Sequence, residues 1–117
     1  MLVDNALKYV RNRMCDLVDN RCYAMTQPIT DADAFPAIVY YLVGTDYTST
    51  FSGLGQGAQR IRIDVRGREY GEVTDLVDKI MERIKDRLVQ VYNVTDAFDD
   101  ELKIYRKIIS VGISPYG

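Results

Sequence analysis

The sequence predicts an α+β fold, in which a mainly antiparallel sheet of four to five strands carries two helices packed on one face. The first observation is the order of the hydrophobic patterns, which reads helix, strands, helix, strands. The second is size. With 117 residues, 47% of them hydrophobic and 27% charged, residues 1–117 suffice for one domain with a real core. They do not suffice for a core hollowed by a deep cleft.

The N-terminal part is expected to contain a helix, a short strand and a loop. Residues 4–19 place apolar side chains on one helical face, namely Ala6, Leu7, Val10, Met14, Leu17 and Val18. Residues 21–25 have the composition of a short strand, and residues 26–35 that of an irregular loop. Pro36 then precedes residues 37–44, whose β-branched and aromatic residues predict a strand covered on both faces or buried in an interface.

The middle of the chain is expected to contain a long loop, a strand and the clearest helix. Residues 45–57 show no helical period and contain three glycines, which predicts a flexible or sharply turning loop. Ile61, Ile63 and Val65 alternate with charged residues, as in a strand with one apolar face. Between residues 70 and 88 the apolar residues return at helical spacing, which predicts an amphipathic helix about 28 Å long.

The C-terminal part is expected to form a hairpin. Residues 89–95 and 102–113 have strand-like composition. Between them lies a predicted acidic turn with Asp96, Asp99, Asp100 and Glu101. These acids lack the spacing and the glycine of a calcium-binding loop, so the turn does not predict a metal site.

Composition excludes several kinds of chemistry. The chain has no histidine, which removes Ser-His-Asp and Cys-His catalysis as well as histidine-ligated metals. The formal net charge of −2 does not fit a protein that binds by neutralising many phosphates. The glycines of residues 45–57 precede a strand instead of a helix, so they do not predict a phosphate-binding loop. We therefore expect no catalytic residue, cofactor or metal, and a protein that is not an enzyme.

The two cysteines and the hydropathy indicate where the chain is made. Cys15 and Cys22 lack further ligands for a zinc site and are too few for a disulfide scaffold. We expect them to be reduced, partly buried thiols in a protein made in the cytoplasm. No apolar stretch approaches the roughly 20 residues of a membrane span.

Two groups of residues are candidates for an interface. Arg60, Arg62 and Arg66 lie on the charged side of their predicted strand, which favours a solvated or subunit-facing surface over a nucleic-acid face. Tyr40 and Tyr41 place aromatic area on both sides of the sheet, which is typical of a core and also of a protein interface.

The segments also follow one another in a distinctive order. An N-terminal helix and a short RCY strand come first, followed by the FPAIVYYLVG strand and the TSTFSGLGQGAQ loop. Next come the RIRIDVRGREYGEV strand-to-helix junction, the LVDKIMERIKDRL helix and the YRKIISVGIS strand. This series resembles the tail-completion or tail-terminator proteins of long-tailed double-stranded DNA phages and prophages. The resemblance covers nearly the whole chain and rests on order and spacing instead of a single motif.

The resemblance implies a structural virion protein. Members of this family form a six-subunit ring at the head-proximal end of the tail, where the ring caps the tail tube and stops its polymerisation. The implied partners are further copies of the chain, the tail tube protein and a head-tail connector or head-closure protein. DNA passes through the ring without specific binding, no membrane is involved, and the family has no catalytic motif to transfer.

Three groups of residues fit this role as hypotheses. The first is a subunit interface that meets acidic residues of a neighbour, formed by Arg60, Arg62 and Arg66 with Tyr40 and Tyr41. The second is a docking loop that orders against the tube or the connector, formed by Tyr47, Phe51, Gly53, Leu54 and Gly55. The third is a lumen surface that repels phosphates, formed by Asp99 and Asp100.

Two other classes remain open. A head-closure or neck connector ring protein would share the size and the ring, but would join the head before the tail arrives. A small nucleic-acid-binding module would use the arginine strand as its platform and would bind with a steep dependence on salt.

Overall fold

The computed structural model describes residues 6–18, 22–24, 35–50, 53–85, 89–101 and 103–113. Along the chain the elements are α1 (Ala6–Met14), the 3-10 helix η1 (Cys15–Val18), β1 (Cys22–Ala24), β2 (Ala37–Thr50), β3 (Gly53–Gly67), α2 (Tyr70–Ile84), β4 (Val89–Asp99) and β5 (Ile104–Ile113). The strands form one five-stranded sheet in the order β1-β2-β3-β5-β4. The predicted α+β fold is confirmed.

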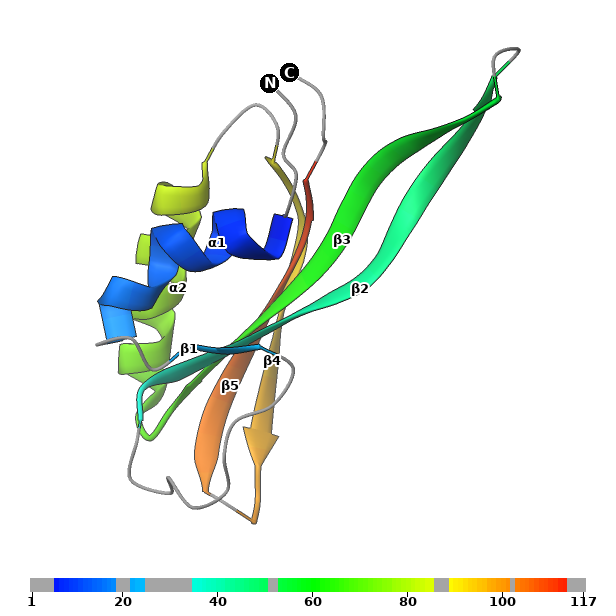
Figure 1. The fold of residues 1–117 in the computed structure, drawn as a ribbon. Helices are drawn as coiled ribbons and strands as arrows, with labels where there is room; N and C mark the ends of the chain where they lie inside the picture. The colour runs from blue at the N-terminus through cyan, green and yellow to red at the C-terminus, as the bar shows by residue number, and fades with distance from the viewer. Residues whose placement is uncertain are drawn as a thin grey trace.

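The sheet is mixed because of one short strand. β1 pairs with β2 in parallel, whereas the pairs β2–β3, β3–β5 and β4–β5 are antiparallel. Both helices lie on the same face of the sheet (Figure 1). We call the opposite face the far face. Among the described residues, no helix is long and apolar enough to cross a membrane.

The core lies between the two helices and the sheet. Its buried side chains come from α1, from the inner stripe of α2 and from the helix-facing positions of the strands. The central members are Val10, Met14, Ile38, Ile61, Ile63, Val73, Val77, Ile80, Ile109 and Val111. The three-and-four spacing in the helices and the two-residue alternation in β3 place these side chains on facing surfaces, as predicted.

Both helices end earlier than the sequence pattern predicts. α1 ends at Met14, and its last turn tightens into η1 instead of continuing as an α-helix to residue 19. α2 begins at Tyr70 as predicted and ends at Ile84, four residues short of the expected end. At its N-terminus the carbonyl of Glu69 accepts the amide of Val73 at 3.2 Å. Glu72 lies in the first turn, where the helix dipole favours a negative charge.

The two cysteines contradict the prediction of reduced thiols. Cys15 in η1 and Cys22 in β1 form a disulfide, with their Cα atoms 5.5 Å apart. Two cysteines are too few to hold a whole fold together, but they can still fasten two neighbouring segments. Here a single bond joins the end of the first helix to the edge of the sheet, across a sequence separation of seven residues.

The predicted long loop at residues 45–57 is also wrong. The described part of this segment is a β-hairpin, in which Thr45 pairs with Gln59 and Thr50 with Gly53, with one register shift between Thr45 and Tyr47. Glycines usually weaken strands, whereas threonine and tyrosine favour them. In this segment the pairing between β2 and β3 forms despite the glycines. β5 pairs with β3 only from Gln59 onwards, so the hairpin beyond that point extends past the rest of the sheet (Figure 1). We call residues 45–50 and 53–58 the arm.

The predicted C-terminal hairpin is confirmed, with a shorter turn than expected. β4 continues to Asp99, so Asp96 and Asp99 lie in the strand and only Asp100 and Glu101 remain in the turn. The carboxylate of Asp99 accepts the amide of Glu101 at 3.0 Å. Lys103 closes the turn with a φ of 55°.

Candidate functional site

The two sides of β3 differ completely in chemistry. Ile61, Ile63 and Val65 face the helices and are buried. The intervening residues lie on the far face, where Arg60 and Arg62 are exposed and Arg66 is half-buried. Asp64 lies among these arginines yet is itself buried. The alternation predicted from the sequence is therefore confirmed, and the charged side of the strand forms the centre of the far face.

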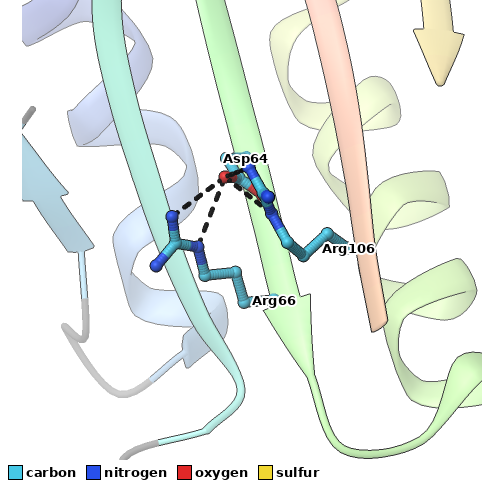
Figure 2. Close-up of polar contacts among 3 residues, drawn as sticks. All are labelled: Asp64, Arg66 and Arg106. Carbon is cyan, nitrogen blue, oxygen red and sulfur yellow. Dashed lines mark hydrogen bonds and ion pairs between the residues drawn. The ribbon is translucent and has the colours of Figure 1, made fainter. Parts of the chain in front are cut away.

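Asp64 binds two arginines, Arg66 from its own strand β3 and Arg106 from the neighbouring strand β5 (Figure 2). Arg106 Nη2 donates to Asp64 Oδ2 at 2.6 Å, and its Nε lies 3.2 Å from both carboxylate oxygens. Arg66 donates to Oδ2 through Nη2 at 3.1 Å and through Nε at 3.3 Å. Arg66 and Arg106 are register partners in the β3–β5 ladder, which places both guanidinium groups beside the same carboxylate.

The triad of Asp64, Arg66 and Arg106 has a net positive charge, because two arginines surround a single buried aspartate. The side chain of Asp64 is only 3% exposed, so its charge requires partners of opposite sign. The hydrogen bond to Asp64 raises the pKa of Arg106 above its ordinary value, which keeps that guanidinium charged at every accessible pH. The sequence pattern placed Arg66 on this face but did not predict Arg106. Only the pairing register of β3 with β5 places Arg106 beside Asp64.

A hollow of about 230 Å³ lies on the far face beside the triad. It is lined by Val43 from β2, Arg60 and Arg62 from β3, Tyr92 and Asn93 from β4, and Ser110 from β5. We call it the bulge hollow, because a β-bulge stands on each side of it.

Each bulge contributes one exposed side chain to the bulge hollow. In β2, Leu42 pairs with Ile61 and Gly44 with Arg60, so Val43 is an extra residue. In β4, Val91 pairs with Val111 and Asn93 with Ser110, so Tyr92 is the extra residue. Val43 is 49% exposed and Tyr92 is 46% exposed. Because β-bulges often re-aim a side chain beside a functional site, the bulge hollow is a candidate interaction site.

Tyr92 is held in place by its surroundings. A Cβ atom at Gly112 would lie 2.6 Å from the Tyr92 hydroxyl, so the absence of a side chain there lets the ring lie against β5. The guanidinium of Arg60 stands 5.8 Å from the centroid of the same ring. The bulge hollow therefore combines a cation, an aromatic ring and an aliphatic side chain.

The other predicted interface residues lie in different surroundings. Tyr41 is half-buried on the far face, where it is the register partner of Arg62. Tyr40 is only 5% exposed and belongs to the core, so it offers little surface to a neighbour. Arg66 is engaged by Asp64 within the chain. Of the candidate interface, Arg60 and Arg62 line the bulge hollow.

The predicted docking residues fall in the arm. Tyr47 lies in β2 opposite Gln56, and Leu54 lies in β3 opposite Ser49. Gly53 and Gly55 pair with Thr50 and Thr48. Phe51 lies outside the described residues. The four described positions therefore belong to a projecting hairpin, and not to a loop.

The predicted lumen residues lie at another end of the molecule. Asp99 ends β4 and is half-buried, and Asp100 follows in the exposed turn. Beside this hairpin, the Tyr70 hydroxyl donates to Asp96 at 2.9 Å and Lys107 pairs with the same carboxylate at 3.1 Å. The hydrogen bond from Lys107, with that from Tyr70, lowers the pKa of Asp96. The same contact with Asp96 raises the pKa of Lys107.

A second hollow, of about 500 Å³, lies on the helix side of the molecule. Its lining includes Glu69, Glu72 and Asp75 around the first turns of α2, together with Pro36 and Lys79. We call the three carboxylates the acidic strip. All three side chains are exposed. Among the described residues, no group of three cysteine, aspartate or glutamate side chains is placed to hold a metal ion.

Comparison with known proteins shows that the fold of this chain is similar to that of a solved structure. No family model matches the chain, and no curated protein matches it. Among solved structures, a chain of the "Virion of native gene transfer agent (GTA) particle" is similar, with a TM-score of 0.62 and 12% sequence identity. The match covers 93% of this chain and 91% of that chain. The two chains share a fold along almost their whole length.

Proposed function

We propose that this chain is a structural protein of a phage-type virion, and that it is a tail-completion or tail-terminator subunit. The observation that carries the proposal is the shared fold with a chain of a gene transfer agent virion, which extends over 93% of the residues. The order of segments in the sequence supports the same class. The chain contributes no histidine, so a role through geometry and assembly suits it better than one through catalysis.

In this role six copies form a ring that caps the tail tube, stops its polymerisation and joins the head connector. Rings require two different patches on each subunit that fit one another. The far face of the sheet supplies one charged and partly apolar patch. The arm supplies a projecting hairpin suited to contact the tube or the connector.

Electron microscopy of particles made without the protein tests the termination role. We expect overlong tails beside filled heads that lack tails. Tails of normal length would contradict termination, and unjoined tails of normal length would instead assign the chain to the head-closure or neck class. In a reconstruction of intact particles, Asp99 and Asp100 should line the DNA channel. Their location on the outer wall would end the lumen hypothesis.

A shortened arm tests the docking role. Deletion of residues 47–56 removes matched halves of the hairpin, because Tyr47 and Gln56 are register partners. The deletion lies beyond the part of β3 that pairs with β5, so the melting temperature should change little. Complementation by this variant should fail to terminate tails, and normal termination would show that the arm is only a connection.

A further inference from the structure

The bulge hollow and the acidic strip lie on opposite sides of the molecule and have opposite charge. The bulge hollow is lined by Arg60 and Arg62 of the far face, whereas the acidic strip consists of exposed residues at the start of α2. Helix α2 packs on the opposite face of the sheet (Figure 1). We propose that the bulge hollow and the acidic strip are the two halves of one contact between copies, in which the bulge hollow of one copy receives the first turns of α2 from the next. This deepens the proposed function by naming the surfaces that would close its ring.

The spacing of the charges suits such a contact. Arg60 and Arg62 lie two residues apart on one face of a strand, about 7 Å along the chain. Glu72 and Asp75 lie three residues apart on α2, which brings their Cβ atoms to about 5 to 6 Å. Long arginine side chains span this small difference. Two guanidinium groups can therefore meet two carboxylates at once, which fixes orientation as well as attraction.

The contact also has apolar surface to bury. Val43 and Tyr92 are exposed at the bulge hollow, and Pro36 lies beside the acidic strip in the second hollow. Exposed ion pairs alone stabilise little and are screened by salt. Aromatic and aliphatic area at the centre with charges around it is the usual composition of a specific interface.

The location of the two patches dictates the symmetry. Because one copy uses its far face and the next uses its helix side, the contact is head-to-tail. A head-to-tail contact generates a closed ring or an open filament, and never a closed dimer with two identical patches. A nucleic acid is a poorer occupant of the bulge hollow, since the chain as a whole carries a net charge of −2.

Two charge-reversed proteins test the pairing. The first carries Arg60→Glu with Arg62→Glu, and the second carries Glu72→Lys with Asp75→Lys. In the first protein both patches are acidic, and in the second both are basic. Sedimentation at low ionic strength should show self-association of the wild type, and each variant alone should associate at least about tenfold more weakly. An equal mixture of the two variants should regain association, because each patch then finds an opposite charge on the other protein.

Matched controls separate this contact from general charge effects. Arg11→Glu with Lys85→Glu makes the same change of charge as the first variant at exposed positions away from the bulge hollow. Asp100→Lys with Glu101→Lys matches the second variant on the β4–β5 turn. Both controls should associate like the wild type, and circular dichroism should show that all four proteins are folded.

Several results would overturn the proposal. These are a wild type that stays monomeric, a mixture that fails to associate, or controls that weaken association as much as the test variants. Unchanged association of Arg60→Glu with Arg62→Glu, combined with lost binding to duplex DNA, would overturn it and assign the bulge hollow to nucleic acid. The measurement uses purified protein, so it is independent of tail length. Restored association together with normal tails in particles lacking the protein would retain the contact and reject the terminator role.

Discussion

The two faces of strand β3 have different roles. Toward the helices, Ile61, Ile63 and Val65 are almost fully buried in a core of close-packed aliphatic side chains. Toward the far face, Arg60 and Arg62 remain exposed, and Asp64 is buried only together with the arginines that neutralise it. The first side stabilises by removing apolar area from water, whereas the second stabilises little and instead positions charge.

This difference separates stability from recognition. Substitutions on the helix side should lower the free energy of unfolding, whereas substitutions of the exposed arginines should leave stability almost unchanged and alter what the protein binds.

Ile63→Ala should lower the free energy of unfolding by about 3 to 4 kcal/mol. Ile63 is fully buried at the centre of the core, so the substitution removes apolar contacts and leaves a cavity. Its neighbour on the far face is the matched control, and Arg62→Ala should change the same quantity by no more than about 0.5 kcal/mol. Urea denaturation measures both. Similar losses from the two variants would contradict the separation of the two sides.

Cys15→Ser combined with Cys22→Ser should lower the free energy of unfolding by about 2 to 3 kcal/mol. The disulfide fastens η1 to β1, and its loss frees that short segment in the unfolded chain. Thermal melting with and without reductant measures the effect. Mass spectrometry after alkylation is the check, because a wild type that takes up two labels without reductant would have no disulfide.

Asp64→Asn should lower the free energy of unfolding by about 2 kcal/mol. The substitution leaves two guanidinium groups facing a neutral amide. The cost stays below that of a fully buried pair, because the side chains of Arg66 and Arg106 are partly exposed and can turn toward water. Arg66→Gln should cost less, since Asp64 keeps its shorter bond to Arg106. A larger loss from Arg66→Gln than from Asp64→Asn in urea denaturation would contradict this order of the two effects.

The smallest effect concerns pH. Asp96 has a pKa below its ordinary value of 3.8 in the folded chain, so its ionised form stabilises the fold above about pH 4. This contribution is lost as pH falls through the folded-state pKa. Asp96→Asn should therefore flatten the acid limb of a plot of melting temperature against pH. An unchanged limb would show that the contact with Lys107 and Tyr70 does not persist in solution.

The sequence predicts most of the fold because its patterns are local. The alternation at Ile61, Ile63 and Val65 and the helical spacing that begins at Tyr70 each depend on neighbouring residues alone. The sequence does not predict the arm, because glycine and serine indicate turns when each segment is considered alone, whereas the pairing of Thr45 with Gln59 depends on the opposing strand.

The candidate site is predicted only in part, because it depends on contacts distant in sequence. Arg60 and Arg62 follow from the period of one strand. Arg106 joins Asp64 only through the β3–β5 register, and Tyr92 reaches the bulge hollow only because β4 has one residue more than its partner. The disulfide likewise depends on where β1 enters the sheet.

Val43, the extra residue of β2 in the β2–β3 hairpin, has a consequence at the level of the gene. Val43 lies between the body of the sheet and the arm, and it is the residue of β2 that stands between two successive pairs with β3. Loss of this single codon would make Leu42–Ile61 and Gly44–Arg60 consecutive pairs of an unbroken ladder, so the arm would keep its register while the bulge hollow lost one wall. A deletion at this point of the gene should therefore impair recognition more than folding.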